Sequence, residues 1–290
     1  MKTLIVNADD FGLTPGVNAG ILRAFRDGIL TSTSIMANGP AFEDAVELTQ
    51  KSPEIDVGCH LVLVGGKSVA PPAEIPSLVK RDGELPATLF ELVCRLWGGI
   101  VEEADIEREF RAQLERCIAA GVTPTHLDTH KHTHAHPAVM NALFHVAKEF
   151  NIVRVRMPFE HASRREPVPR ASGTGSGSIT QRILASAVGM AAPAFRRGLR
   201  DYNLRSPQYF FGAALTGHMG TAALKHLIET LPEGTSEIMC HPGVCDAELE
   251  QSDTRLKKQR EVELDALTDP AILQTIADKN VRLVPYRELN

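Results

Sequence analysis

The chain has 290 residues, of which 43% are hydrophobic and 23% are charged, a composition typical of a soluble globular protein. Its net charge of −5 argues against a general nucleic-acid binder, which would need a basic surface. The apolar run at the N-terminus is too short for a secretory signal, and no segment reaches the ~20 apolar residues of a membrane span. The five cysteines form no C-x-x-C pair, which favours reduced thiols in a cytoplasmic protein.

Apolar runs and helix signals alternate along the chain. A buried strand is predicted at 3–8 and ends at the sequence DDFG; Thr14 then caps a helix that has Pro15 at its first position and stops near Gly28. Further strands are predicted at 32–36, 56–64, 125–130, 152–157, 236–240 and 281–285. Further helices are predicted at 41–50, 87–97, 104–120, 137–150, 224–231 and 255–267.

This alternation predicts an α/β fold with mostly parallel strands and helices outside. Polar residues fall at the ends of several predicted strands, and in a β/α barrel those ends share one face. We therefore expect a complete or incomplete (β/α) barrel, with a doubly wound open sheet as the alternative. No repeat or linker divides the chain, so we expect a single domain over 1–290 with an insertion or lid at about 160–207.

The most apolar stretch, 183–195, is broken by Pro193 and flanked by Arg182 and Arg196. An ordinary buried helix would explain it. The alternative is an interfacial patch over 181–200, whose apolar face and basic rim would suit peripheral contact with a membrane or a lipid-like substrate.

The most informative segment is THLDTHKHTHAHP, residues 125–137. Its five histidines and its one aspartate all occupy even positions: His126, Asp128, His130, His132, His134 and His136. Alternate residues of a strand face the same side, so a strand here would line one face with imidazoles and a carboxylate. Such groups are the usual ligands of a divalent metal. A solvated histidine-rich loop is the alternative.

Asp9 and Asp10 directly follow the first predicted strand. A turn there could bring both carboxylates to one site, where one binds a metal and the other acts as a general base. The alternative is that acidic residues merely favour the start of the next helix. His60 lies inside an apolar strand, where a lone histidine is usually a core residue. A metal-binding role for His60 is favoured because Asp10 and His130 would need a third ligand. One Asp with two His leaves positions on the metal open for water and substrate.

Two further residues complete the candidate set. His241 follows the predicted strand 236–240 and could protonate a leaving group. Arg156 could pair with a carboxylate of the site or with substrate oxygens. The alternative for Arg156 is a surface ion pair of little energetic value.

Five motifs occur in order along the chain: NADDFG (7–12), VGCHL (57–61), PTHLDTHKHTH (124–134), VRMP (155–158) and EIMCHP (237–242). Together they resemble the signatures of the YdjC-like carbohydrate deacetylases and cover nearly the whole chain. That family is related in architecture to NodB-type polysaccharide deacetylases, which implies a distorted (β/α) barrel. The blocks at 131–137, 62–79 and 181–200 most resemble the hopanoid-biosynthesis (HpnK-type) branch, which is associated with an N-acetylglucosaminyl hopanoid.

The resemblance implies a role for each matching position. Asp10, His60 and His130 would bind one divalent metal ion, which could be zinc, magnesium, manganese or cobalt. Asp9 would be the general base and His241 the general acid. Arg156 would orient Asp9 or the substrate, and His132 and His134 would support the site or bind the sugar.

The sequence therefore predicts a metal-dependent hydrolase that removes an N-acetyl group from an amino sugar, with a hopanoid glycolipid as the expected substrate and a homodimer suggested by the family. Soluble chitooligosaccharides are an alternative substrate. A non-haem iron oxygenase, a phosphoesterase and a non-catalytic sugar-binding protein are three functions that compete with the deacetylase.

Overall fold

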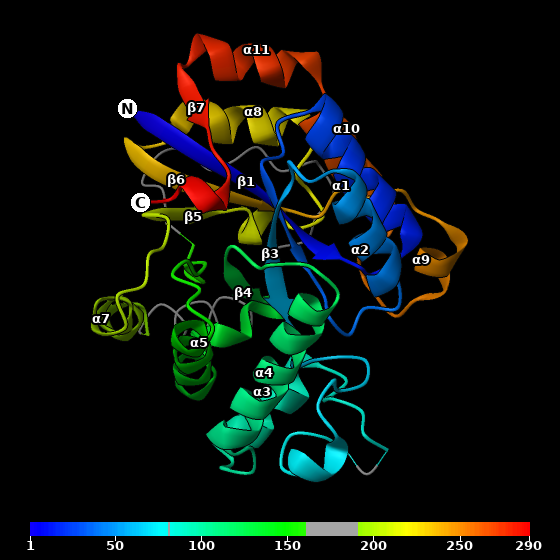
Figure 1. The fold of residues 1–290 in the computed structure, drawn as a ribbon. Coiled ribbons are helices and arrows are strands. Elements are labelled where there is room, and N and C mark those ends of the chain that lie inside the picture. Colours follow the sequence, from blue (N-terminus) through cyan, green and yellow to red (C-terminus); the bar gives the residue numbers. More distant parts are fainter. Residues whose placement is uncertain (81, 161–190) are drawn as a thin grey trace.

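The computed structural model describes residues 1–80, 82–160 and 191–290. Seven parallel strands form one curled sheet in the order β4-β3-β2-β1-β6-β5, with β7 beside the start of β1 (Figure 1). The strands are β1 (Lys2–Phe11), β2 (Ser32–Ile35), β3 (Asp56–Leu61), β4 (Leu127–Thr129), β5 (Tyr209–Phe211), β6 (Gly234–Cys240) and β7 (Val281–Leu283). Helices surround this sheet, so the predicted distorted (β/α) barrel is confirmed.

Each strand is joined to the next by helical or irregular segments outside the sheet. The helices are α1 (Pro15–Asp27), α2 (Phe42–Lys51), α3 (Leu89–Trp97), α4 (Glu103–Ala119), α5 (Pro137–Glu149), α7 (Ala192–Asp201), α8 (Thr221–Thr230), α9 (Ala247–Gln251), α10 (Gln259–Leu267) and α11 (Pro270–Asp278). Short 3-10 turns are η1 (Pro72–Glu74), η2 (His130–Ala135), η3 (Ala213–Leu215) and η4 (Tyr286–Glu288). Among the described residues no helix combines the length and apolar character needed to cross a membrane.

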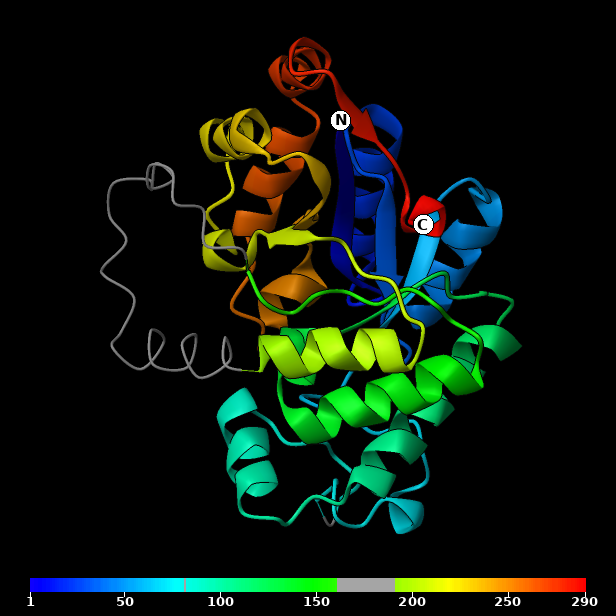
Figure 2. The same ribbon diagram turned by 90° about the vertical axis from the view of Figure 1, so that its left-hand side faces the viewer.

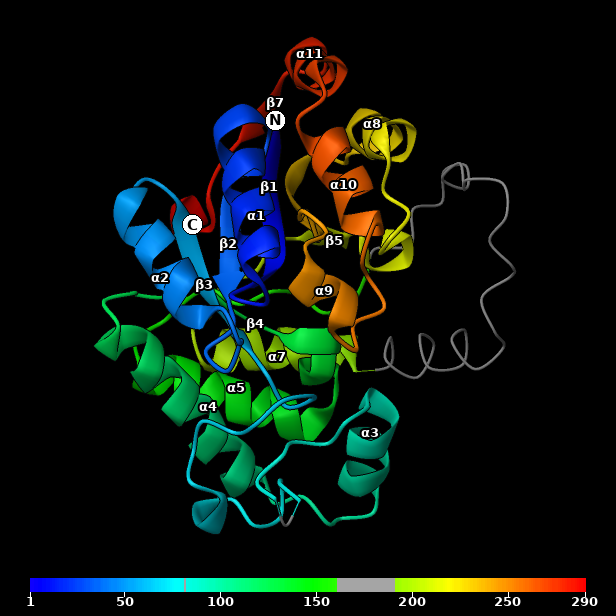
Figure 3. The same ribbon diagram turned by 90° about the vertical axis from the view of Figure 1, so that its right-hand side faces the viewer.

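The first helix shows why the local signals were informative. The Thr14 side chain accepts a hydrogen bond from the Val17 amide, Pro15 stands in the first turn, and the helix ends at Gly28 as predicted. The helix α1 contacts α10, and the two helices lie side by side outside β1 (Figure 3). This packing matters for function because both helices border the turn that follows β6.

The prediction of a strand at 152–157 is wrong. This segment makes only isolated parallel bridges, from Val155 to Leu127 on one side and from Arg154 to Arg205 on the other. It therefore lies between β4 and the segment before β5, where it links the two edges of the curled sheet without forming a strand of its own.

Part of the predicted insertion at 160–207 can be described. Its residues 161–190, and with them most of the apolar stretch 183–195, lie outside the described residues. The helix α7 lies alongside α5 (Figure 2), and its Phe195 is buried against Phe144 with ring centroids 5.1 Å apart. In α7, Arg196, Arg197 and Arg200 are exposed.

Candidate active site

The carboxyl ends of four parallel strands carry the candidate residues. Asp9 and Asp10 lie at the end of β1, His60 near the end of β3, His130 directly after β4, and His241 directly after β6. Because the strands are parallel, these ends meet at one edge of the sheet. The prediction that polar residues from distant parts of the sequence converge is confirmed for this edge.

A bulge, rather than a turn, aims both aspartates at the site. The pairing of β1 with β2 shifts register between Ala8 and Phe11, and Asp10 has a φ of +68°. A positive φ is uncommon for a residue with a side chain, and a bulge redirects the side chains around it. The bulge explains how two consecutive strand residues can both contribute to one site.

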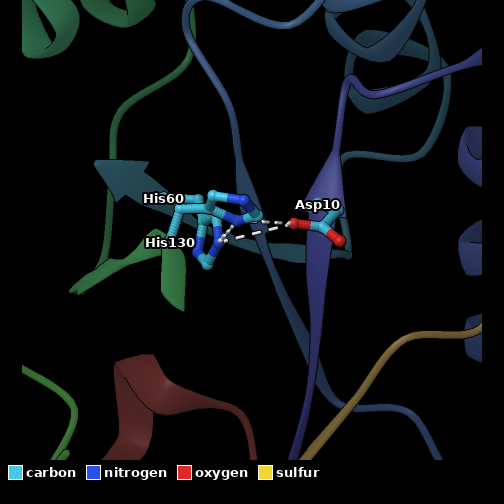
Figure 4. Close-up of side chains that lie close together, drawn as sticks. All are labelled: Asp10, His60 and His130. Carbon is cyan, nitrogen blue, oxygen red and sulfur yellow. Dashed lines mark hydrogen bonds and ion pairs between the residues drawn. The ribbon is translucent and has the colours of Figure 1, made fainter. Parts of the chain in front are cut away.

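Three side chains converge as a candidate metal site (Figure 4). The Oδ1 atom of Asp10 lies 3.5 Å from Nε2 of His60 and 3.2 Å from Nδ1 of His130. The two imidazole nitrogens are 3.3 Å apart. Asp10 and His60 are buried, whereas the His130 side chain is 23% exposed, so the cluster can be reached from outside.

The chemistry of this cluster fits a divalent metal ion. The Oδ1 atom of Asp10 is buried and has no hydrogen-bond partner, which is unusual for a carboxylate oxygen. On the far side of the His60 ring, Nδ1 lies 2.8 Å from Oδ1 of Asp128. A proton on Nδ1 leaves a lone pair on Nε2 that faces the cluster, which is the arrangement that metal-binding histidines use. Zinc, manganese and cobalt accept such nitrogen and oxygen ligands, whereas magnesium would rely on the carboxylate and on bound waters.

Asp128 lies at the site, although the sequence analysis gave it no role. Besides His60, its carboxylate contacts the Ser34 hydroxyl at 2.9 Å and the Arg156 guanidinium at 2.7 Å. Complete burial would raise the pKa of Asp128, but Arg156 and His60 hold it far below its usual value. Its even position in the histidine run was the available signal, because it placed Asp128 on the same face as His130.

Arg156 is fully buried and joins three carboxylates. It donates to both oxygens of Asp9, at 2.7 and 2.6 Å, and its Nε donates to Glu237 at 2.8 Å. Burial lowers the pKa of Arg156, but the surrounding carboxylates raise it well above its usual value, so the side chain is a permanent cation. Arg156 is fully buried, and its two hydrogen bonds to Asp9 fit the predicted role of orienting that carboxylate rather than contact with a substrate.

The electrostatics of the metal cluster follow from the same neighbours. Burial lowers the pKa of His60, but Asp128, Asp9 and Asp10 together raise it to about 9. Burial would raise the pKa of Asp10, yet Arg260 and His130 hold it well below its usual value. Without a metal, the His60 ring therefore carries a second proton in addition to the one on Nδ1. Metal binding at this cluster would release that second proton.

His241 is held through its backbone. Its amide donates to Oε2 of Glu263 at 2.6 Å, and its Nδ1, 4.0 Å from the same oxygen, is buried without a hydrogen-bond partner. The turn after it packs tightly on α1, since a Cβ on Gly20 would lie 2.4 Å from the Cα of Gly243. His241 thus sits on a rigid turn while its ring keeps a free nitrogen.

The remaining histidines of the run diverge because the strand ends at Thr129. Lys131 and His132 adopt positive φ values of 56° and 53°, which breaks the alternation. His132 is partly exposed and packs edge-on against Phe210, whereas His134 is fully buried. Both nitrogens of the His134 ring bond to protein groups, the Thr129 hydroxyl and the Arg156 carbonyl. With both nitrogens occupied and the ring buried, His134 is not placed to contact a sugar.

The other two histidines lie away from the metal cluster. His126 is buried, stacked on Tyr286 with ring centroids 3.9 Å apart, and burial lowers its pKa to about 4. His136 caps the start of α5 and contacts the ring of Trp97. The structure thus brings one of the five histidines into the cluster.

Comparison with known proteins gives a consistent result. The model of the YdjC-like protein family matches residues 3–278. A carbohydrate deacetylase of Geobacillus stearothermophilus is 37% identical over 285 residues, which cover 98% of this chain and 96% of the relative. A chitooligosaccharide deacetylase of Serratia marcescens is 32% identical over 289 residues, which cover 99% of both proteins.

A solved structure supports the fold. The crystal structure of an Enterococcus faecalis protein with a suggested role in cellobiose-phosphate cleavage superposes with a TM-score of 0.77 at 25% identity. The match covers 98% of this chain and 97% of the other.

Proposed function

The chain belongs to the YdjC-like protein family, and we propose that it is a metal-dependent hydrolase that removes the N-acetyl group of an N-acetylated amino sugar. The observation that carries this proposal is the meeting of Asp10, His60 and His130 beside the Asp9 carboxylate. The names of the relatives, carbohydrate and chitooligosaccharide deacetylases, support the substrate class.

The proposed reaction is hydrolysis of an amide. The oxygen of water forms a bond to the acetyl carbon, the bond from that carbon to the sugar nitrogen breaks, and the products are acetate and a free amine. A divalent metal held by Asp10, His60 and His130 would polarise the acetyl carbonyl and lower the pKa of the attacking water.

Asp9 is proposed as the general base. One of its oxygens belongs to a group that also includes His60 and Asp128, with ligand atoms all within 4.8 Å of one another. Oδ1 accepts from Arg156 and from Asn7, whereas among the described residues Oδ2 accepts from Arg156 alone, so Oδ2 keeps a lone pair that can take the proton of the water. Arg156 fixes the direction in which that lone pair points.

His241 is proposed as the general acid. It follows β6, which is paired with β1, so it stands beside the strand that carries Asp9. Its free Nδ1 shows that the ring is not committed to a structural hydrogen bond there. A protonated His241 would give its proton to the departing amine and so prevent the amine from returning to the acetyl carbon.

The narrower proposal is that the substrate is a glycolipid of the N-acetylglucosaminyl hopanoid type. The motif blocks at 131–137 and 62–79 support it, and so does an exposed apolar surface on α3 and the residues after it. Phe90, Trp97 and Ile100 are 78%, 75% and 57% exposed, and the Trp97 ring lies 5.1 Å from that of His136, directly after the turn that carries His130. Such a surface would suit an apolar aglycone. His132, partly exposed on the same turn, is proposed to contact the sugar.

The exposed arginines of α7 support a related proposal, in which a cytoplasmic protein touches the inner membrane face to reach its lipid substrate. Arg196, Arg197 and Arg200 would provide a basic surface for anionic headgroups. Co-sedimentation with anionic but not neutral vesicles tests this contact. Analytical ultracentrifugation tests the homodimer that the family suggests.

The substrate is tested by acetate release from purified, metal-loaded protein. We expect acetate from N-acetylated glucosamine compounds and faster turnover on N-acetylglucosaminyl hopanoid than on diacetylchitobiose. Equal rates on the two would contradict the lipid proposal but keep the deacetylase. Oxygen-dependent turnover with iron and without acetate would instead favour an oxygenase.

A further inference from the structure

Arg260 is a buried cation at the site that the proposed chemistry does not use. It lies on α10 and is 1% exposed. Its Nη2 donates to Oδ2 of Asp10 at 2.6 Å, its Nε donates to the Leu256 carbonyl at 3.2 Å, and its Nη1 is buried without a partner. Burying a guanidinium with one nitrogen unsatisfied lowers the stability of the folded protein. A buried arginine of this kind is therefore a candidate for a functional role.

The two oxygens of Asp10 have different partners. Oδ2 faces Arg260, whereas Oδ1 faces the nitrogens of His60 and His130. Arg260 donates to Oδ2 at 2.6 Å, whereas the nearest histidine nitrogen, Nδ1 of His130, lies 3.2 Å from Oδ1. Asp10 stands on a bulge with positive φ, where its side chain has no regular strand neighbours to fix its rotation.

Arg260 is itself held firmly from the other side of the site. Its carbonyl accepts the Gly243 amide at 3.3 Å, and a Cβ on Gly243 would lie 3.2 Å from its Cδ. One turn further along α10, Glu263 accepts the amides of His241 and Gly217 at 2.6 and 2.9 Å. The helix therefore ties the metal-site carboxylate to the turn that carries His241.

We propose that Arg260 is a positioning residue, which fixes the rotation of Asp10 so that Oδ1 faces the two histidines and which sets the distance from this cluster to His241. The proposal rests on the proposed metal site. It has a direct competitor, because Arg260 could instead serve only to neutralise the charge of Asp10. The two accounts predict opposite effects on metal affinity, since removing a cation near a metal site strengthens binding unless the ligand loses its orientation.

The experiment measures metal affinity in Arg260→Gln and Arg260→Lys by competition of Zn²⁺ with a chelating indicator, at one pH, on metal-stripped protein. We expect a 10- to 100-fold loss of affinity in Arg260→Gln, the range found when groups that orient metal ligands are removed. Arg260→Lys restores the charge without the planar guanidinium, so we expect it to recover only part of the loss. The Co²⁺ absorption spectrum should change in Arg260→Gln, because it reports the ligand geometry.

Controls separate positioning from folding. Arg282→Gln removes an exposed arginine that pairs with Glu288 at 3.0 Å, and it should leave affinity and spectrum unchanged. If Arg260→Gln does not fold, Arg260→Lys decides the matter: the same affinity and Co²⁺ spectrum as the wild type would overturn the proposal. Unchanged or stronger Zn²⁺ binding in folded Arg260→Gln would overturn it as well. If the wild-type chain binds no metal, the proposed function itself fails. If the wild type binds metal and the Arg260 variants bind it with the same affinity, only this inference is overturned.

Discussion

On the side of the site built by β1, β3 and β4, Arg156, Asp9, Asp128 and His60 are locked in one buried network of hydrogen bonds and ion pairs. On the side built by β6 and α10, the described residues hold His241 through its backbone amide, and none of them makes a hydrogen bond to its ring Nδ1. A fully satisfied buried network specifies a single geometry, which suits groups that must be in place before substrate arrives. A side chain that must release a proton is better left with a free nitrogen.

The largest effect is expected for Asp9→Asn, which changes the proposed base inside the buried network. The amide keeps the shape of the side chain but cannot accept the proton of water, so turnover should fall by about 10²- to 10⁴-fold. Metal content, measured by atomic absorption, should stay at the wild-type level because Asp9 is not assigned to the metal. Full activity in this variant would remove Asp9 from the mechanism.

The next test breaks the network at its centre. In Asp128→Asn, the amide can donate as well as accept, so the proton on His60 Nδ1 is no longer enforced, and Arg156 loses a counter-charge. We expect metal affinity to fall by roughly 10- to 100-fold. Asp278→Asn, at an exposed position that accepts from Gln274, is the matched control for the same assay. Equal affinities in the two variants would show that the network does not set the metal site.

The smallest expected effect concerns stability. Burial raises the pKa of Glu237 to about 7, above its usual value of 4.5, even though Arg156 opposes the shift. A carboxyl with a raised pKa stabilises the folded state below its unfolded pKa, and this contribution is lost as the pH rises through the folded pKa. Glu237→Gln should therefore gain stability relative to the wild type between pH 4.5 and 7, by about 1–3 kcal/mol.

Urea unfolding of Glu237→Gln and wild type at several pH values measures this difference. Glu229→Gln, at an exposed position of α8, serves as the control and should follow the wild type at every pH. If the curve of Glu237→Gln ran parallel to that of the wild type, the buried carboxyl would not be the source of the pH dependence.

The length of each strand and the signals at its ends explain which strands could be predicted from the sequence. The strands that are long or bounded by clear signals, such as β1, β3 and β6, were found, because buried parallel strands appear as short apolar runs. The three-residue β5 was missed, since so short a strand leaves no pattern, and 152–157 has a strand-like composition but makes only isolated bridges. The roles of the site residues remain predictions, although the structure brings Asp10, His60 and His130 together as expected.

Arg260 and Glu263 escaped prediction for a physical reason. They lie on α10 among many charged residues, and from sequence alone a buried charge in such a helix cannot be told from its solvated neighbours. Only the three-dimensional structure shows that these two side chains face inward: Arg260 contacts Asp10, and Glu263 accepts the His241 and Gly217 amides. Asp128 was also given no role, although its place in the alternation of the histidine run was a usable signal.

The central claim is that Asp10, His60 and His130 hold a metal ion on which deacetylation depends. Its most direct test is acetate release from diacetylchitobiose and N-acetylglucosaminyl lipid by metal-stripped protein to which Zn²⁺, Mg²⁺, Mn²⁺ or Co²⁺ is added back in steps. The account predicts that acetate release is lost on stripping, returns with one of these ions, saturates at about one ion per chain and does not return in His130→Ala. Undiminished acetate release by stripped protein, or none from fully loaded protein on either substrate, would contradict it.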